Sequence, residues 1–291
     1  MKDKKKFTKG KANRRSLADR MKAYENVITG ASLIERLPIY ARVDMRAGHS
    51  FCKGLDKPFD SAYSNAMRFA TAYVLEHTGA IVASSQSDES SFCWLDDTKI
   101  PFGTRLFKLE SVIASMFTSA FFKACIGTKL ENKLEKMLPS FDCRCCNLPN
   151  LSEAANMFCW REQDSKKNSI TLLALEHFST KQLDKKNGID KIAMLKDIGV
   201  DYWKTIPEDL RNGAYFRRET YSKEVSEEDL ACNPKMKMPA KSADGKYYVT
   251  RSHVVQFYPG MSLDEMSNKE DVLFRHAIAM KKNSNNDNTI Q

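Results

Sequence analysis

Acidic residues stand where the sequence predicts the end of a strand and the tip of a hairpin. Asp44 ends the alternating run of residues 39–44, and Asp88 and Glu89 lie in a short polar segment between two apolar ones. If the strands are neighbours, Asp44 and Asp88 face each other, and their charges repel unless a cation lies between them. Partly open sets of oxygen ligands favour Mg²⁺, and a pair of such ions can activate a hydroxyl and stabilise leaving pyrophosphate. Acidic side chains at hairpin tips are also common as solvated turn residues, so spacing alone leaves both explanations open.

The periodicity of apolar residues predicts the elements that would position these carboxylates. Residues 39–44 alternate between apolar and polar, which predicts a strand with Arg42 and Asp44 on the same face. A helix should begin after Asp60, a typical N-cap residue, and end at Gly79, a typical C-terminal glycine.

The following segments complete a recognisable order of elements. Residues 80–94 predict a β-hairpin with Asp88 near its tip, and the apolar stripe of residues 109–121 predicts a second helix. Residues 142–147 could supply a fourth strand, and a long helix should run from residue 152 to about residue 178. Strand, helix, hairpin and helix open the ferredoxin-like split βαβ arrangement. We therefore expect an α+β fold of this type, with additional helices and a small C-terminal extension.

Composition limits the class of protein. The 291 residues are 42% apolar and 29% charged, which is typical of a folded globular protein and argues against wholesale disorder. No apolar window long enough to span a bilayer occurs, and the lysine-rich start lacks the apolar segment of a secretory signal, so we expect no membrane contact. Eight cysteines without regular spacing predict reduced thiols in a cytoplasmic protein.

Positive charge is concentrated at the N-terminus. Residues 1–15 hold eight Lys or Arg and one Asp, so they contribute +7 to a net charge of +9. A basic arm on a nearly neutral body could contact a phosphate backbone. It could equally be a solubilising disordered tail.

Seven ordered motifs carry a family resemblance. They occupy residues 42–46, 57–60, 86–92, 105–111, 141–144, 160–169 and 213–218. Together they resemble the catalytic core of the tRNA-histidine guanylyltransferase family, the 3′-to-5′ polymerases that add nucleotides at the 5′ end of RNA. The resemblance covers roughly residues 35–220 and is closer to the guanylyltransferase-like members of bacteria and viruses than to the eukaryotic enzymes.

The resemblance implies a polymerase-type palm, in agreement with the split βαβ arrangement. The palm-type catalytic domain is expected in residues 23–180. The charge distribution predicts a basic N-terminal arm in residues 1–22, the mixed pattern predicts a helical or mixed C-terminal region in residues 181–280, and the polar composition predicts a disordered tail in residues 281–291.

The resemblance also assigns catalytic and metal-binding positions. Asp44 and Asp88 match the two aspartates that bind two Mg²⁺ ions in the family, and Glu89 matches the acid beside the second aspartate. The backbone of Met45 would complete the metal coordination. These residues are expected to be the catalytic centre.

A second set of matched positions implies binding of ATP or GTP. The segment from Met45 to His49 would cradle a triphosphate with backbone N–H groups, and Ser87 would line the same site. Arg105 and Lys108 stand one helical turn apart, so both could reach a second triphosphate. The complete nucleotide-binding set is Met45, Arg46, Ala47, Gly48, His49, Ser87, Arg105, Lys108 and Ser111.

Four further positions match residues near the active site of the family. Asp60 matches an aspartate close to that site. Arg161, Asp164 and Asn168 are spaced as one polar stripe of a helix, which in the family helps to hold nucleotide and RNA.

Two departures from the family pattern affect the functional prediction. Met45 and Gly48 stand where the family has a glycine and a phenylalanine, and Met45 would be strained if that glycine needed a positive φ. Residues 166–169 read Lys-Lys-Asn-Ser in place of a His-Ile-Asn-Asn run tied to histidine-tRNA recognition. Repair of 5′-truncated tRNAs by templated addition therefore fits better than strict selectivity for histidine tRNA.

The resulting prediction is a Mg²⁺-dependent nucleotidyltransferase that acts on tRNA and nucleoside triphosphates. The resemblance also implies that the protein is a homo-oligomer, a tetramer. One alternative is a catalytically silent RNA-binding protein of the same fold, which Met45 and the basic arm motivate. A palm-fold nucleotidyl cyclase is a further alternative, but the motifs at residues 160–168 and 213–218 argue against it.

Overall fold

The structure, a computed structural model, describes residues 16–275 apart from 96–99, 233–238, 240 and 243. The expected basic arm is therefore described only from Ser16 onward, and the expected polar tail of residues 281–291 lies outside the described residues. In the described segments, no helix is long and apolar enough to cross a membrane.

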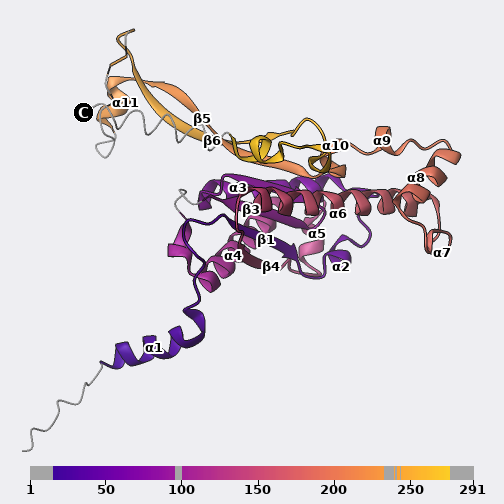
Figure 1. The fold of residues 1–291 in the computed structure, drawn as a ribbon, viewed down its shortest axis with the longest axis horizontal. Helices are drawn as coiled ribbons and strands as arrows, with labels where there is room; N and C mark the ends of the chain where they lie inside the picture. Colours follow the sequence, from indigo (N-terminus) through magenta and orange to yellow (C-terminus); the bar gives the residue numbers. More distant parts are fainter. Residues whose placement is uncertain (1–15, 96–99, 233–238, 240, 243, 276–291) are drawn as a thin grey trace, which may run out of the picture.

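One antiparallel sheet runs through the described chain, with the strand order β4-β1-β3-β2-β5-β6 (Figure 1). Its strands are β1 (Ile39–Met45), β2 (Val82–Gln86), β3 (Glu89–Trp94), β4 (Phe141–Asn147), β5 (Ala214–Val225) and β6 (Tyr247–Phe257). The order β4-β1-β3-β2 is the ferredoxin-like arrangement that the element order predicted. The α+β palm-like fold is thereby confirmed.

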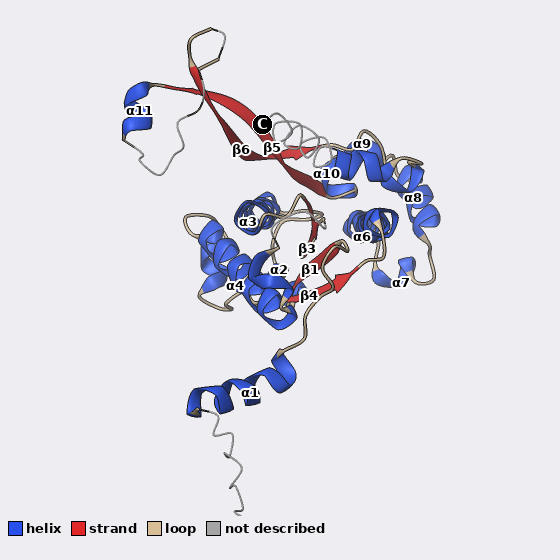
Figure 2. Ribbon diagram, turned by 60° about the vertical axis from the view of Figure 1, so that its left-hand side comes forward, coloured by secondary structure: helices blue, strands red, loops and turns tan. Residues whose placement is uncertain are grey.

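Two helices cover one face of the sheet (Figure 2). Helix α3 (Ser61–Thr78) begins where the Asp60 carboxylate accepts a hydrogen bond from the Tyr63 N–H, and Gly79 ends it in a left-handed conformation with φ 72°. Helix α4 (Leu106–Cys125) packs beside it and buries the apolar stripe that the sequence predicted. The largest hydrophobic core lies between these helices and the inward face of β1.

Helix α6 (Leu151–His177) covers the opposite face, over the second hydrophobic core (Figure 2). It begins at Asn150, whose side-chain oxygen accepts a hydrogen bond from the Glu153 N–H. Its Phe158 packs edge-on against Tyr40 of β1, with ring centroids 5.7 Å apart. The sheet is thus buried between α3 and α4 on one side and α6 on the other.

Shorter helices complete the described chain. They are α1 (Leu17–Thr29), α2 (Gly48–Cys52), η1 (Pro101–Thr104), α5 (Glu131–Leu134), α7 (Thr180–Leu183), α8 (Gly188–Asp197), α9 (Tyr202–Thr205), α10 (Glu208–Arg211), α11 (Glu227–Ala231) and η2 (Leu263–Glu265). A third core joins the C-terminal half of α6 to the segment from α7 to α9.

The region beyond residue 180 extends the same sheet. β5 pairs with β2 over Ala214 to Arg217 and with β6 over Tyr215 to Val225, and beyond Arg217 the two strands form a ribbon that projects from the body (Figure 1). Residues of β5 are buried only at its start and exposed toward its end. The sheet therefore includes strands from the expected C-terminal region.

Candidate active site

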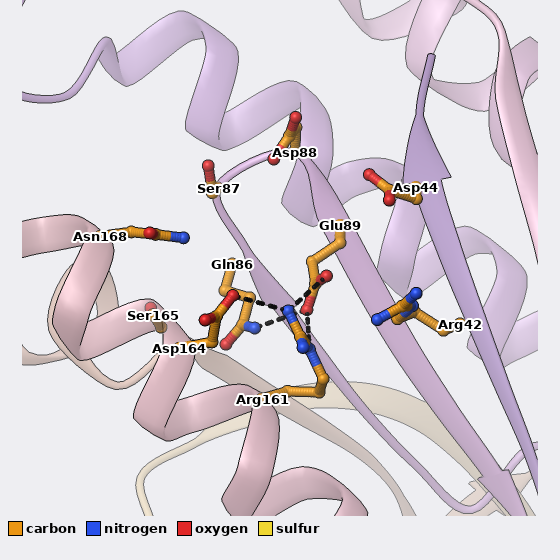
Figure 3. A pocket seen from close by; sticks show the side chains of 10 residues that line it. All are labelled: Arg42, Asp44, Gln86, Ser87, Asp88, Glu89, Arg161, Asp164, Ser165 and Asn168. Atoms are coloured by element: carbon orange, nitrogen blue, oxygen red, sulfur yellow. Dashed lines mark hydrogen bonds and ion pairs between the residues drawn. The ribbon is translucent and has the colours of Figure 1, made fainter. Parts of the chain in front are cut away.

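Four carboxylates lie at the same end of β1, β3 and β4. The antiparallel register places Asp44, near the end of β1, opposite Glu89 of β3 and opposite Asp142 of β4. The Met45 N–H donates to the backbone oxygen of Asp88 over 2.9 Å, which fixes the hairpin turn beside the end of β1. Figure 3 shows Asp44 and Asp88 at the same end of the pocket. The predicted juxtaposition of these two aspartates is therefore present.

Crowding of negative charge changes the titration of Asp44. Burial raises its pKa, and the nearby charges of Asp88 and Asp142 raise it further, while Arg42 and Arg144 act in the opposite direction. An ionised Asp44 is therefore disfavoured in the folded protein, and a bound cation would relieve this penalty.

Asp44, Asp88 and Glu89 line a cavity of about 290 Å³ between the sheet and α6. Its walls are formed by Arg42, Asp44, Gln86, Ser87, Asp88, Glu89, Arg161, Asp164, Ser165 and Asn168 (Figure 3). The α6 residues point into it from successive turns, as their spacing predicted. Asp44 and Asp88 are thus brought together with the polar stripe of α6.

Glu89 is held in a buried ion pair. Its carboxylate accepts two hydrogen bonds from Arg161, with Nε–Oε1 2.5 Å and Nη2–Oε2 2.8 Å, and a third from Gln86 Nε2 over 2.6 Å. Arg161 also binds the Asp164 carboxylate over 2.9 Å. Burial raises the pKa of Glu89, although the hydrogen bond from Arg161 opposes this shift. This geometry connects α6 to the start of β3, and the Glu89 oxygens are occupied by hydrogen bonds from Arg161 and Gln86.

The loop after β1 accommodates both departures from the family motif. Met45 continues the strand, is buried, and is not among the residues with positive φ. The strain that a positive φ would cause at this position is therefore absent. The left-handed residue is Ala47, with φ 56°. A Cβ on Gly48 would lie 2.1 Å from Asp88 Oδ2, which explains why a glycine suits this position. Among the described residues, no acceptor is found for the backbone N–H groups of Ala47, Gly48 and His49, whereas that of Arg46 donates to Ser140.

Four predicted site residues lie elsewhere. The Asp60 carboxylate caps α3 and forms an ion pair with Lys129 Nζ at 2.7 Å. Arg105 precedes α4 and donates to the Phe102 carbonyl, the Lys108 ammonium lies over the Phe102 ring, and the Ser111 hydroxyl donates to the Lys108 carbonyl. None of the four lines the cavity. The part of Arg105, Lys108 and Ser111 in nucleotide binding and the place of Asp60 near the active site remain predictions.

Sequence reasoning assigned no role to several residues of this site. Arg42 lines the cavity because it shares a strand face with Asp44, and Ser165 lines it because it follows Arg161 by one helical turn. Both positions follow from the periodicity of a strand or a helix, so the sequence alone could have placed Arg42 and Ser165 in the site. Asp142 was predicted only as part of a strand, because the register of β4 against β1 cannot be read from spacing.

The donor set suits Mg²⁺ that is shared with a substrate. No three His, Cys, Asp or Glu side chains in the described part of the chain form a set that could hold a metal ion by itself. Mg²⁺ is commonly bound through one or two carboxylates together with water and substrate phosphates. Asp44 and Asp88, both partly open to solvent, fit that pattern.

Family models and curated sequences match the palm. The model described as tRNAHis guanylyltransferase matches residues 18–149. The tRNA(His) guanylyltransferase of Schizosaccharomyces pombe is 34% identical over 141 residues, which are 47% of this chain and 53% of that protein. That of Eremothecium gossypii is 31% identical over 144 residues, 48% of this chain and 60% of that protein. The chain thus spans little more than half the length of these curated relatives.

Solved structures extend the similarity to most of the chain. A bacterial tRNA(His) guanylyltransferase-like protein in complex with ATP is 34% identical, has a TM-score of 0.63, and covers 69% of this chain and 88% of its own. A bacterial protein of the same description in complex with GTP is 28% identical, with a TM-score of 0.63, and covers 89% of this chain and 99% of its own. The guanylyltransferase of Saccharomyces cerevisiae is 26% identical with a TM-score of 0.59, over 66% of this chain and 90% of its own.

Removing one charge from the carboxylate cluster should stabilise the metal-free protein. Because burial and neighbouring charges raise the pKa of Asp44, its ionisation costs stability as pH rises above its unfolded-state pKa. Asp44→Asn should therefore melt at a higher temperature than wild type at pH 7, and the difference should shrink toward pH 3. Saturating Mg²⁺ should stabilise wild type by about 2.7 kcal/mol at a hundredfold excess over Kd, and Asp44→Asn much less. If Mg²⁺ raised the melting temperatures of wild type and Asp44→Asn equally, Asp44 would not be a metal ligand.

Breaking the buried ion pair should be costly. Glu89 and Arg161 side chains are both 9% exposed, so Glu89→Ala leaves a buried guanidinium without its main partner and should lower the free energy of unfolding by about 3–5 kcal/mol. The double variant with Arg161→Ala should cost less than the sum of the single variants. Glu224→Ala is the matched control, because its pair with Lys246 is about half exposed and should contribute less than about 1 kcal/mol. Urea unfolding measures all four, and strict additivity would show that the pair is not coupled.

Proposed function

Because the chain belongs to the tRNAHis guanylyltransferase family, we propose that it is a Mg²⁺-dependent nucleotidyltransferase that extends the 5′ end of tRNA in the 3′-to-5′ direction. The observation that carries this proposal is the convergence of Asp44 and Asp88 on one cavity whose other wall is the polar face of α6. The ATP and GTP complexes of similar bacterial proteins support nucleoside triphosphates as substrates.

Two transfers at phosphorus make up the proposed reaction. In the first, an oxygen of the tRNA 5′-phosphate attacks the α-phosphorus of ATP or GTP, and pyrophosphate leaves. In the second, the 3′-hydroxyl of the incoming nucleotide loses its proton and attacks the activated 5′-phosphorus, and AMP or GMP leaves. No covalent enzyme intermediate is needed, so catalysis depends on positioning and on neutralisation of charge.

The chain's own residues supply the positioning. Asp44 and Asp88, with a backbone oxygen of Met45, would hold two Mg²⁺ ions, which would neutralise phosphate charge and favour ionisation of the attacking hydroxyl. The N–H groups of Ala47, Gly48 and His49, for which the described part of the chain offers no acceptor, would bind triphosphate oxygens. Ser87 closes the same side of the cavity. Glu89, whose oxygens are occupied by Arg161 and Gln86, would act by positioning β3 and α6.

The α6 sequence supports a role in general tRNA 5′-end repair. Lys166 stands in the segment that departs from the histidine-tRNA motif, and its ammonium lies 3.0 Å from Asp264 and 3.5 Å from Glu162. Lys166 therefore forms ion pairs within the protein, and its ammonium is poorly placed to contact a base of the anticodon or of the acceptor stem. Asn168 lines the cavity and remains available to substrate. A cytoplasmic tetramer acting on tRNA remains part of the proposal.

Loss of one aspartate should abolish the reaction. The wild-type protein, given Mg²⁺, ATP, GTP and a 5′-monophosphorylated tRNA that lacks its first nucleotide, should produce tRNA one nucleotide longer. Asp88→Ala should reduce the rate by about a thousandfold or more, because charge that develops at phosphorus is no longer stabilised. Asp197→Ala, at an exposed position at the end of α8, should retain full activity. Products are resolved at single-nucleotide length.

Two results would reject this function. A wild-type protein that binds tRNA in a salt-dependent way without extending it would be the catalytically silent RNA-binding protein. Formation of a cyclic nucleotide in the absence of RNA would instead identify a nucleotidyl cyclase.

A further inference from the structure

Like charges face each other twice on the open side of β1 and β4. The register places Arg42 directly opposite Arg144, and Asp44 directly opposite Asp142. Directly opposed like charges destabilise an antiparallel pair of strands. The ion pair from Arg144 Nη2 to Asp142 Oδ2, 3.3 Å long and more than half exposed, offsets this only weakly. These opposed charges lower the stability of the strand pair at the edge of the cavity. This cost indicates that the arginine pair and the aspartate pair each bind a ligand.

Arg42 has no anionic partner of its own. Its guanidinium lines the cavity, but it forms no hydrogen bond or ion pair with any residue that the structure describes, whereas Arg161 beside it is fully engaged (Figure 3). A guanidinium offers five donors in a planar fork that matches two oxygens of a phosphate. Arg42, which has no ion pair among the described residues, and Arg144, whose ion pair with Asp142 is more than half exposed, therefore present two guanidinium forks next to the Asp44 carboxylate.

An exposed tryptophan lies beside Arg42 and Arg161. Trp160, on α6, is 50% exposed, and its ring centroid lies 5.8 Å from Arg42 Cζ and 4.4 Å from Arg161 Cζ. Packing against an arginine is an ordinary role for an exposed tryptophan. Trp203 on α9 has that role: it is 59% exposed, and its ring centroid lies 5.1 Å from Arg211 Cζ. Of these two, Trp160 is the one that contacts arginines of the cavity.

This face is open in the direction of the sheet edge. β4 is the edge strand of the described sheet, and both Asp142 and Arg144 are exposed on it. A free nucleotide needs only a closed pocket, but an RNA continues beyond its terminal nucleotide and needs an open path. The edge of β4 provides such a path next to Asp44.

We propose that Arg42, Arg144 and Trp160 form the subsite for the 5′-terminal nucleotide of the RNA, with its phosphate on the two guanidiniums and its base stacked on the indole. The identity of the ligand rests on the proposed function. In this subsite the 5′-phosphate lies between the arginine pair and the Asp44–Asp88 pair, where the α-phosphorus of a triphosphate can meet it. Base–tryptophan stacking tolerates any base, which agrees with repair of tRNAs that differ in their first nucleotide.

Binding of a short RNA tests the subsite. The probe is a 3′-labelled oligoribonucleotide with a 5′-monophosphate, measured by fluorescence anisotropy with Mg²⁺ and compared with the same RNA bearing a 5′-hydroxyl. Trp160→Ala should weaken binding about 5- to 150-fold, the range of one base–aromatic stack, and Trp160→Phe should recover most of it. Arg144→Gln should remove most of the preference for the 5′-phosphate. Trp203→Ala, the matched exposed tryptophan, should bind RNA like wild type, and ATP affinity should be unchanged in Trp160→Ala.

Several outcomes would overturn the subsite. These are equal RNA binding by Trp160→Ala and Trp203→Ala, a loss of ATP affinity in Trp160→Ala as large as its loss of RNA affinity, or an unchanged 5′-phosphate preference in Arg144→Gln. Failure of the proposed function is a separate result. A wild-type protein that fails to extend tRNA but still binds the 5′-phosphorylated probe through Trp160 would overturn the polymerase and support the subsite.

Discussion

Negative charge gathered at one end of three neighbouring strands is the constraint on which the site depends. The register of β1 with β4 places Asp44 opposite Asp142, the hydrogen bond from the Met45 N–H to the Asp88 carbonyl brings in Asp88, and burial and repulsion by these two charges raise the pKa of Asp44. Hydrophobic cores on both faces of the sheet supply the free energy that holds this arrangement against repulsion. Such a cluster is stable with cations bound and costly without them. Cation binding at this end of the sheet, which the proposed function requires, would therefore add to the stability of the folded protein.

Helix α6 converts this strand end into a cavity, and parts of the chain distant in sequence hold the helix in place. On its sheet side, Arg161 anchors it to Glu89 of β3. One residue further, the buried Glu162 accepts hydrogen bonds from the Tyr215 hydroxyl over 2.7 Å and from the Leu263 N–H over 3.0 Å. The region beyond residue 180 thus contributes to the site by positioning the helix. Asp44, Asp88 and Glu89 themselves come from β1 and from the hairpin of β2 and β3.

Sequence reasoning succeeded where a periodic pattern fixed an element and failed where a contact joined distant elements. The alternation of residues 39–44 and the cap at Asp60 correctly predicted β1 and the start of α3. The engagement of Glu89 by Arg161, 72 residues away, left no local signal, so Glu89 was predicted only as an acid beside the metal. β5 and β6 were not predicted as part of the palm sheet, because their outer halves are exposed and polar and lack a buried face to alternate with.

The proposed function requires that the Asp44–Asp88 end of the sheet binds divalent metal together with a nucleoside triphosphate. A crystal of the full chain grown with Mn²⁺ and a non-hydrolysable GTP analogue would test this directly through anomalous scattering. Manganese peaks are expected within coordination distance of both the Asp44 and Asp88 carboxylates, with triphosphate oxygens completing the ligand set. Manganese and nucleotide bound elsewhere, with these two carboxylates unliganded, would contradict the proposed function.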